Sequence, residues 1–139
     1  MRRTVTTLFV AVVLSLPIVD ATAAITTATR KVVSTKSFSG STVSVDRWGD
    51  LRVKITVRKT TTITGSKKKV TRKIVSVSVP VYPNHTDRSQ LINEQALPIL
   101  RSETLRAQSA RIDFVSGASD TSDAYIQSLQ SAIVKAKRA

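Results

Sequence analysis

LRVKITVR, at residues 51–58, alternates apolar and polar side chains without interruption. A period of two is typical of a β-strand with one buried face, so this stretch predicts a strand whose other face is basic. Residues 75–81 repeat the pattern with valine at every odd position, and Pro80 places the end of that strand at a sheet edge or outside the ladder. The two strands are predicted to pair antiparallel.

The segment that joins these strands, residues 59–72, is interpreted as an elongated hairpin tip around Gly65. Three lysines follow the turn, namely Lys67, Lys68 and Lys69. Such a run is typical of a solvated loop that keeps a protein soluble. The alternative is a docking contact with an anionic surface, whether lipid, wall polymer or acidic protein.

Residues 42–50 predict a short first hairpin, because two alternating valines precede the turn Trp48-Gly49-Asp50. Helical periodicity begins after the strands. A helix capped by Thr86 or Asp87 is predicted to stop before Pro98, and a second one to run from Pro98 to Gln108 as the other half of a kinked pair.

The last predicted helix covers residues 121–137, where apolar side chains recur at steps of three and four. Asp120, Thr121 or Ser122 can cap it. Because strands come first and helices after, the order favours an α+β fold, a small antiparallel sheet with helices packed on one face.

The N-terminal residues have the layout of a secretory signal peptide. Arg2 and Arg3 precede an apolar run over residues 8–19, and small side chains follow at Ala21 and Ala23. We therefore expect a signal peptide at residues 1–23, a flexible linker rich in Ser and Thr at 24–41, and one domain at 42–139. The expected location is extracytoplasmic, with a membrane-anchored form as the alternative if the segment is retained.

The composition excludes several classes of chemistry. No cysteine is present, which removes thiolate metal sites, disulfides and iron–sulfur clusters, and His85 is the only histidine. We expect no metal site and assign no catalytic residue. Residues 1–23 carry two arginines and one aspartate, so the net charge of +13 falls only to +12 without them. An anionic partner is expected, but not nucleic acid, because aromatic stacking platforms are few.

The most informative stretch for function is DFVSGASDTS, at residues 113–122. A strand-like segment, Ile112 to Val115, leads through small residues into the last helix, and such a junction can bind a phosphate at the helix N-terminus. An ordinary turn and cap is the alternative. A phosphate bound there is expected to contact the backbone of Gly117 and Ala118. It is also expected to contact four hydroxyl side chains, those of Ser116, Ser119, Thr121 and Ser122.

Residues 115–132 resemble the C-terminal signature of the FMN-binding domain family, whose members typically read Ser-Gly-Ala-Thr, one variable residue, then Thr-Ser. Tyr82-Pro83, residues 88–100 and residues 107–110 also resemble small exported actinobacterial-type members. The resemblance implies FMN as cofactor over roughly residues 48–136. Tyr82, Leu91 and Tyr125 are candidates for lining its ring.

The resemblance further implies how the flavin is held. Family members in sodium-pumping quinone reductases and Rnf-type complexes carry FMN esterified to a hydroxyl within Asp-x-x-Ser/Thr-Gly-Ala-Thr/Ser, a pattern that Asp113 to Ser119 satisfies. It implies that Ser119 carries the phosphoester and that Asp113 serves recognition by a flavin transferase. Asp120 either repels the phosphate or points away as a helix cap.

The expected function is extracytoplasmic electron transfer through bound FMN, with a membrane-bound reductase or another donor as partner. The protein is interpreted as a flavin carrier and not as a stand-alone enzyme. The alternative is a flavin-free basic adhesion or docking module with the same fold, favoured by Asp120 and by the lysine run.

Overall fold

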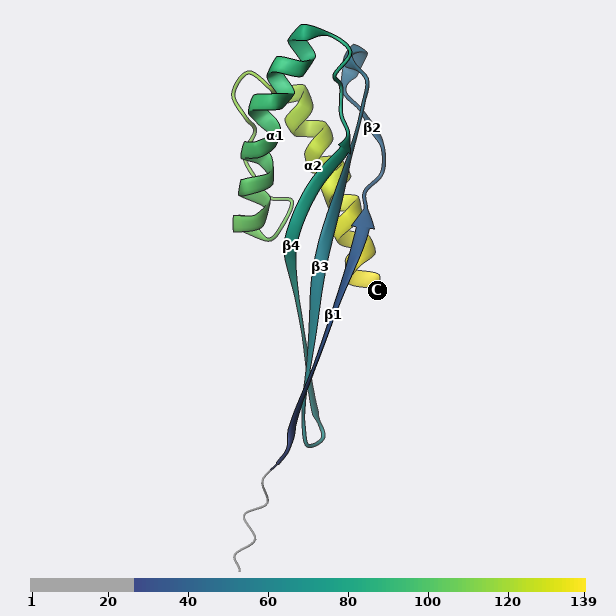
Figure 1. Ribbon diagram of the computed structural model, residues 1–139, viewed down its shortest axis with the longest axis vertical. Helices are drawn as coiled ribbons and strands as arrows, with labels where there is room; N and C mark the ends of the chain where they lie inside the picture. The colour runs from purple at the N-terminus through teal and green to yellow at the C-terminus, as the bar shows by residue number, and fades with distance from the viewer. Residues whose placement is uncertain (1–26) are drawn as a thin grey trace, which may run out of the picture.

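A computed structural model describes residues 27–139 of the chain, so the predicted signal peptide lies outside the described residues. The elements follow the predicted order, strands first and helices after (Figure 1). They are β1 (Thr29–Ser39), β2 (Val43–Ser44), the 3-10 helix η1 (Asp46–Trp48), β3 (Asp50–Thr64), β4 (Lys67–Val81), α1 (Asp87–Ala107) and α2 (Ser119–Arg138). The predicted α+β class is confirmed.

Strand β3 is the centre of an antiparallel sheet. Strand β4 pairs along one edge, from Thr64↔Lys67 to Arg52↔Val81, which confirms the predicted long hairpin. Strands β1 and β2 both pair with the other edge of β3, β1 with residues 54–64 and β2 with residues 50–51. The N–H of Gly40 donates to the carbonyl of Val53 at 2.7 Å in the gap between them, so β1 and β2 act as one interrupted strand.

The buried face of the sheet is the one predicted for β3, where Leu51, Val53, Ile55 and Val57 are all buried. Strand β4 departs from the predicted alternation. Its pairing shifts between Thr56↔Ser76 and Val57↔Ile74, so Val75 is an extra residue and Ile74 takes the inward position. A β-bulge of this kind reverses the side-chain alternation beyond it, and an unbroken valine pattern does not reveal it.

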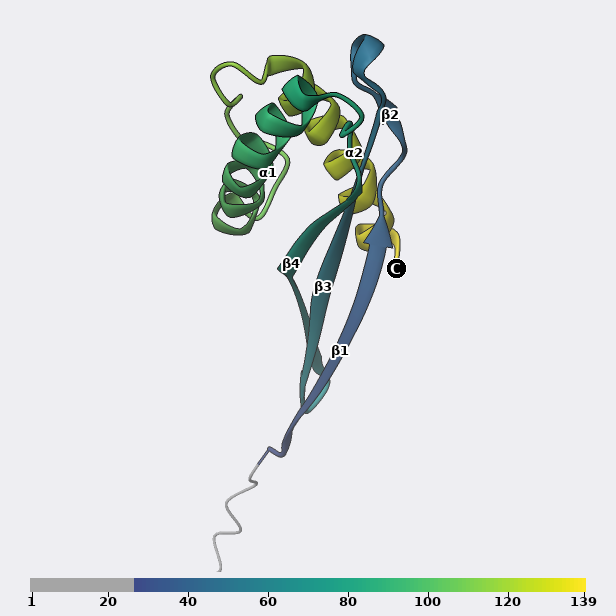
Figure 2. The same cartoon turned by 45° about the horizontal axis from the view of Figure 1, so that its top comes forward.

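Both helices pack against this face (Figures 1 and 2). Helix α2 contributes Tyr125, Leu129 and Ala132, each wholly buried. Burial raises the pKa of Tyr125 to about 12, an effect that a hydrogen bond with Thr104 partly opposes. Tyr125 is therefore a core residue, and the expectation that it lines a flavin ring is wrong.

The predicted linker is also wrong for most of its length, because residues 29–39 form β1 and pair with β3 from Thr29↔Thr64 to Ser39↔Lys54. Almost every side chain of β1 is exposed, so the sequence shows no apolar alternation. Its order comes from backbone hydrogen bonds and from valine and threonine, which favour extended backbone. Only Phe38 packs against the core.

The predicted break at Pro98 does not occur, since α1 runs through it to Ala107. A proline inside a helix costs about 3 kcal/mol, but Pro98 and Glu94, whose carbonyl loses its partner, are both exposed to water. One buried stripe continues on either side of the proline, from Asn93 through Leu97 to Leu100 and Thr104. Its burial outweighs the lost hydrogen bond. Thr86 and Ser89 cap the helix with a reciprocal capping box.

The outer parts of three strands extend beyond the helices (Figures 1 and 2). We call residues 29–36, 58–64 and 67–73 the arm, and the turn at Gly65 and Ser66 marks its free end. The chain enters the arm at that end, because Thr29 pairs with Thr64. Within residues 27–139, no helix is apolar and long enough to cross a bilayer.

Candidate functional site

The Ser-Gly-Ala-Ser segment is a tight turn that opens α2. The N–H of Ala118 donates to the carbonyl of Val115 at 3.0 Å, and Gly117 has a φ of 81°, in the left-handed region that favours glycine. A Cβ added to Gly117 would meet nothing within 4 Å, so the backbone here faces open space. The strand predicted at residues 112–115 is absent; this segment has no regular structure.

The first turn of α2 lacks a side-chain cap. Its N-cap residue is Ala118, which has no hydrogen-bonding side chain, and the three predicted caps lie inside the helix. The predictions for Asp120, Thr121 and Ser122 as caps are therefore wrong. The N–H groups of the first turn receive no side-chain acceptor and lie at the positive end of the helix dipole. This end of α2 can bind an anion.

The predicted site hydroxyls divide into two pairs. Ser116 and Ser119 are exposed, as a ligand contact requires. Ser122 is wholly buried: its hydroxyl donates to the Ala118 carbonyl at 2.7 Å and accepts from the N–H of Val115 at 3.0 Å. The Thr121 hydroxyl, also buried, donates to Asn93 Oδ1 at 2.9 Å. These two hydroxyls hold the turn in shape, and the prediction that they donate to a phosphate is not supported.

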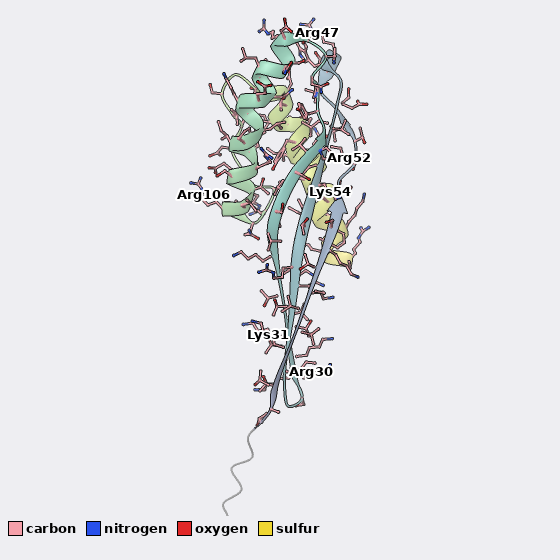
Figure 3. All side chains as sticks on the ribbon, viewed as in Figure 1. Arg30, Lys31, Arg47, Arg52, Lys54 and Arg106 are labelled. Atoms are coloured by element: carbon pink, nitrogen blue, oxygen red, sulfur yellow. The ribbon has the colours of Figure 1, made fainter. Side chains whose placement is uncertain are left out.

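An open cavity lies between this turn and the start of α1. One side is formed by residues 117–121, and the opposite side, which is largely apolar, is formed by residues of the β2–η1 segment, of the β4–α1 connection and of α1. Its apolar residues are Val45, Trp48, Pro83 and Ile92. The guanidinium of Arg47, at the end of the molecule opposite the arm (Figure 3), lies 5.3 Å from the centre of the Trp48 ring. The cavity thus joins a polar, anion-binding end to an apolar wall.

Asn93 connects the elements around the cavity. Its side chain is 1% exposed, its Nδ2 donates to the Pro83 carbonyl at 2.7 Å, and its Oδ1 accepts from Thr121. Sequence reasoning missed both Asn93 and the ring of Trp48, which the sequence indicates only as part of a turn. An asparagine within the apolar stripe of a predicted helix indicates a buried polar contact, and this signal could have identified Asn93.

Two acidic residues lie near the turn. Asp113 is exposed in the segment before it, accessible to another protein. Asp120 is exposed in the first turn of α2 and lines the cavity. Because Asp120 is not the cap, the interpretation that it points away as a cap does not hold. Its carboxylate shares the cavity with any anion bound there.

Comparison with known families identifies the family of the domain. The sequence model of the FMN-binding domain matches residues 46–134, from η1 to the last turns of α2. The chain belongs to the FMN-binding domain family. It is a flavin-binding protein with FMN as its cofactor. The curated proteins compared with it give no match.

The residues of the cavity fit the two ends of FMN, the cofactor of the FMN-binding domain family. A phosphate needs backbone N–H donors and room close to the main chain, which the uncapped turn and Gly117 provide. A flat aromatic ring needs an apolar wall, which Trp48 and Pro83 provide. Within residues 27–139, no three His, Asp or Glu side chains come together as a metal site would require.

Proposed function

We propose that this chain is an extracytoplasmic electron carrier whose FMN phosphate is held at, and esterified to, the turn from Ser116 to Ser119. The observation that carries the proposal is the exposed Ser119 hydroxyl at the first position of an uncapped helix, beside a glycine that leaves the backbone open. Bound FMN would supply one- and two-electron redox chemistry. The protein positions the phosphate, and its apolar wall shields one side of the ring.

The pattern Asp113-x-x-Ser116-Gly117-Ala118-Ser119 supports covalent attachment by a transferase. The bond formed joins Ser119 Oγ to the flavin phosphorus. An activated donor is needed, so a phosphoanhydride bond of a flavin dinucleotide breaks, and a nucleoside monophosphate leaves as the serine hydroxyl gives up its proton. Exposure of both Asp113 and Ser119 lets a second protein reach the segment.

Replacement of Ser119 tests this proposal. The chain is coexpressed with a flavin transferase, and its intact mass and visible absorbance are measured for the unaltered protein, Ser119→Ala and the matched control Ser116→Ala. We expect the unaltered protein and the control to carry a mass increment of one FMN less one water, and Ser119→Ala to lose it completely.

The other outcomes separate the alternatives. Colour that is released on denaturation, with no added mass, would show tight but noncovalent binding. A colourless chain in every preparation would contradict the carrier proposal. It would favour the flavin-free docking module. Two features support that alternative, the carboxylate of Asp120 at the cavity and the basic arm.

Asp120→Asn is expected to increase noncovalent FMN affinity about two- to fivefold. A flavin phosphate carries about −1.5 to −2 charges at pH 7, and the exposed carboxylate repels it across a cavity that both share. The substitution should also cost about 0.3–1 kcal/mol of stability, because Asp120 interacts favourably with the N-terminus of α2.

Fluorescence titration with FMN at low and high salt measures this effect. Asp123→Asn is the matched control, since Asp123 lies further along α2 and accepts from Gln127 Nε2 at 2.7 Å. Added salt screens the repulsion, so it should raise the FMN affinity of the unaltered protein toward that of Asp120→Asn. Equal affinity of Asp120→Asn and the unaltered protein at low salt would place the phosphate away from the first turn of α2.

A further inference from the structure

The charge of this protein is concentrated on its sheet. Residues 29–39 and 51–81 carry twelve Lys and Arg side chains and no Asp or Glu. Figure 3 shows two of them, Arg30 and Lys31, in the arm, far from the helices. Within residues 27–139 the only salt bridge joins Arg106 to Glu103 in α1. The cations of the arm therefore have no carboxylate on their own strands.

The register of the arm places like charges side by side. Arg58 lies opposite Lys73, and Lys59 opposite Arg72. Like charges directly opposite each other destabilise a strand pair. Two successive pairs of this kind, on alternate faces of the hairpin, oppose folding of the arm. The Nζ of Lys59 donates to an oxygen of the C-terminal Ala139 at 3.2 Å, and an anionic partner would reduce the repulsion that remains.

The free end of the arm is also apolar. Val32, Thr61 and Val70 lie side by side across the three strands, and Arg30, Ile63 and Lys68 form the row two residues further out on the same face. Val32 is 44% exposed and Val70 37% exposed. Exposed valines flanked by cations match the boundary between charged lipid headgroups and acyl chains. An inorganic polyanion such as polyphosphate has no apolar group that gains from contact with valine.

The free end of the arm lies close in sequence to the apolar N-terminal run. Thr29 lies at the free end of the arm, and residues 20–28 alone separate it from the apolar run at residues 8–19. Nine residues reach at most about 30 Å when fully extended. A bilayer that takes up the apolar run, during export or as a lasting anchor, is therefore within reach of the cationic end.

We propose that the free end of the arm binds the surface of a membrane that contains anionic phospholipid, through Lys67, Lys68 and Lys69 together with the Val32–Val70 row. The flavin cavity lies at the other end of β3. With a rise of about 3.3 Å per residue, the fifteen residues of β3 span roughly 50 Å. Docking by the arm therefore leaves the cavity open to partners that stand out from the membrane.

Vesicle cosedimentation tests the proposal. The chain from Ala24 onward keeps every strand and helix of the structure and the whole core, and it lacks the apolar run, which would itself enter lipid. We expect it to bind vesicles of phosphatidylglycerol and phosphatidylcholine and not vesicles of phosphatidylcholine alone. Replacing all three tip lysines (Lys67→Gln, Lys68→Gln and Lys69→Gln) should weaken binding roughly tenfold or more.

Two further variants show which feature of the arm matters. The control Arg88→Gln, Arg111→Gln and Arg138→Gln removes the same charge from exposed positions outside the arm, and should change binding less than about twofold. Val32→Thr with Val70→Thr keeps β-branched side chains in the strands and should weaken vesicle binding about three- to tenfold, while binding to soluble polyphosphate stays unchanged.

Three results would overturn the proposal. Binding to phosphatidylcholine alone as strong as to the anionic vesicles would remove the electrostatic basis. Equal vesicle binding by the lysine variant and its charge-matched control would place the contact elsewhere. Retention on duplex DNA or polyphosphate, together with no loss of vesicle binding in the valine variant, would assign the arm to a soluble polyanion.

Discussion

Gly40→Ala is expected to lower the free energy of unfolding by about 3 kcal/mol or more. A Cβ at this position would lie 2.0 Å from the carbonyl oxygen of Ser128 and 2.5 Å from its Oγ. The oxygen belongs to the backbone of α2, so no side-chain rotation relieves the overlap. The helix must move away from the sheet, or β1 must separate from β3.

The same movement would break the hydrogen bonds that join α2 to the gap between β1 and β2. The Ser128 hydroxyl accepts from the N–H of Val53 at 2.8 Å and donates to the Ser41 carbonyl at 2.7 Å. The N–H of Ser41 donates to the hydroxyl of Ser131 at 2.6 Å. Val53 is wholly buried, and an unpaired buried N–H costs about 1–3 kcal/mol.

Urea unfolding followed by circular dichroism measures the loss, and Gly117→Ala is the matched control. Gly117 has open space where the alanine methyl would lie but a φ of 81°, so alanine there costs only the local backbone strain, about 1–2 kcal/mol. Equal urea midpoints for the two variants would show that contact with α2 does not exclude a side chain at position 40. A larger loss at Gly40 confirms the contact.

The sequence predicted those parts of the fold in which one face of an element is buried. Strand β3 alternates because its odd positions face α2, and the periodicity of α2 has the same cause. Strand β1 was missed because its side chains are exposed and its pairing with β3 is a backbone property. The bulge at Val75 was missed for a related reason, since valine fits either face of a half-buried strand.

The candidate site was predictable where chemistry is local in sequence. The tight turn at Gly117 follows from small residues before a helix, and Ser119 is exposed, as the attachment that the family pattern implies would require. The missing cap was not predicted, because Asp120, Thr121 or Ser122 was expected to provide it. The apolar wall was not predictable, because Trp48, Pro83 and Ile92 come from separate elements that meet only in the folded chain. The roles of Thr121 and Ser122 were misassigned because a hydroxyl near a phosphate site and one that holds a turn look alike in sequence.

Asn93→Leu is expected to lower the free energy of unfolding by about 2–4 kcal/mol and to reduce flavin incorporation. Leucine has the same branching and the same number of heavy side-chain atoms, although its methyl groups take more room than the amide. The main change is that the Pro83 carbonyl and the Thr121 hydroxyl both lose their partner. Each buried polar group left unpaired costs about 1–3 kcal/mol. Loss of these bonds also frees the first turn of α2 from the two segments that form the rest of the cavity.

A double-mutant cycle with Thr121→Val separates this explanation from a general loss of packing. Asn93→Leu leaves the Pro83 carbonyl and the Thr121 hydroxyl unpaired, and Thr121→Val leaves Asn93 Oδ1 unpaired, whereas the double variant leaves only the Pro83 carbonyl. The double variant therefore has two fewer unpaired groups than the sum of the single variants, and it should be about 0.5–2 kcal/mol more stable than additivity predicts. Urea midpoints give the coupling, and the mass increment of FMN gives the incorporation. Strict additivity, or full incorporation in Asn93→Leu, would show that this buried bond neither joins the two helices nor fixes the turn that carries Ser119.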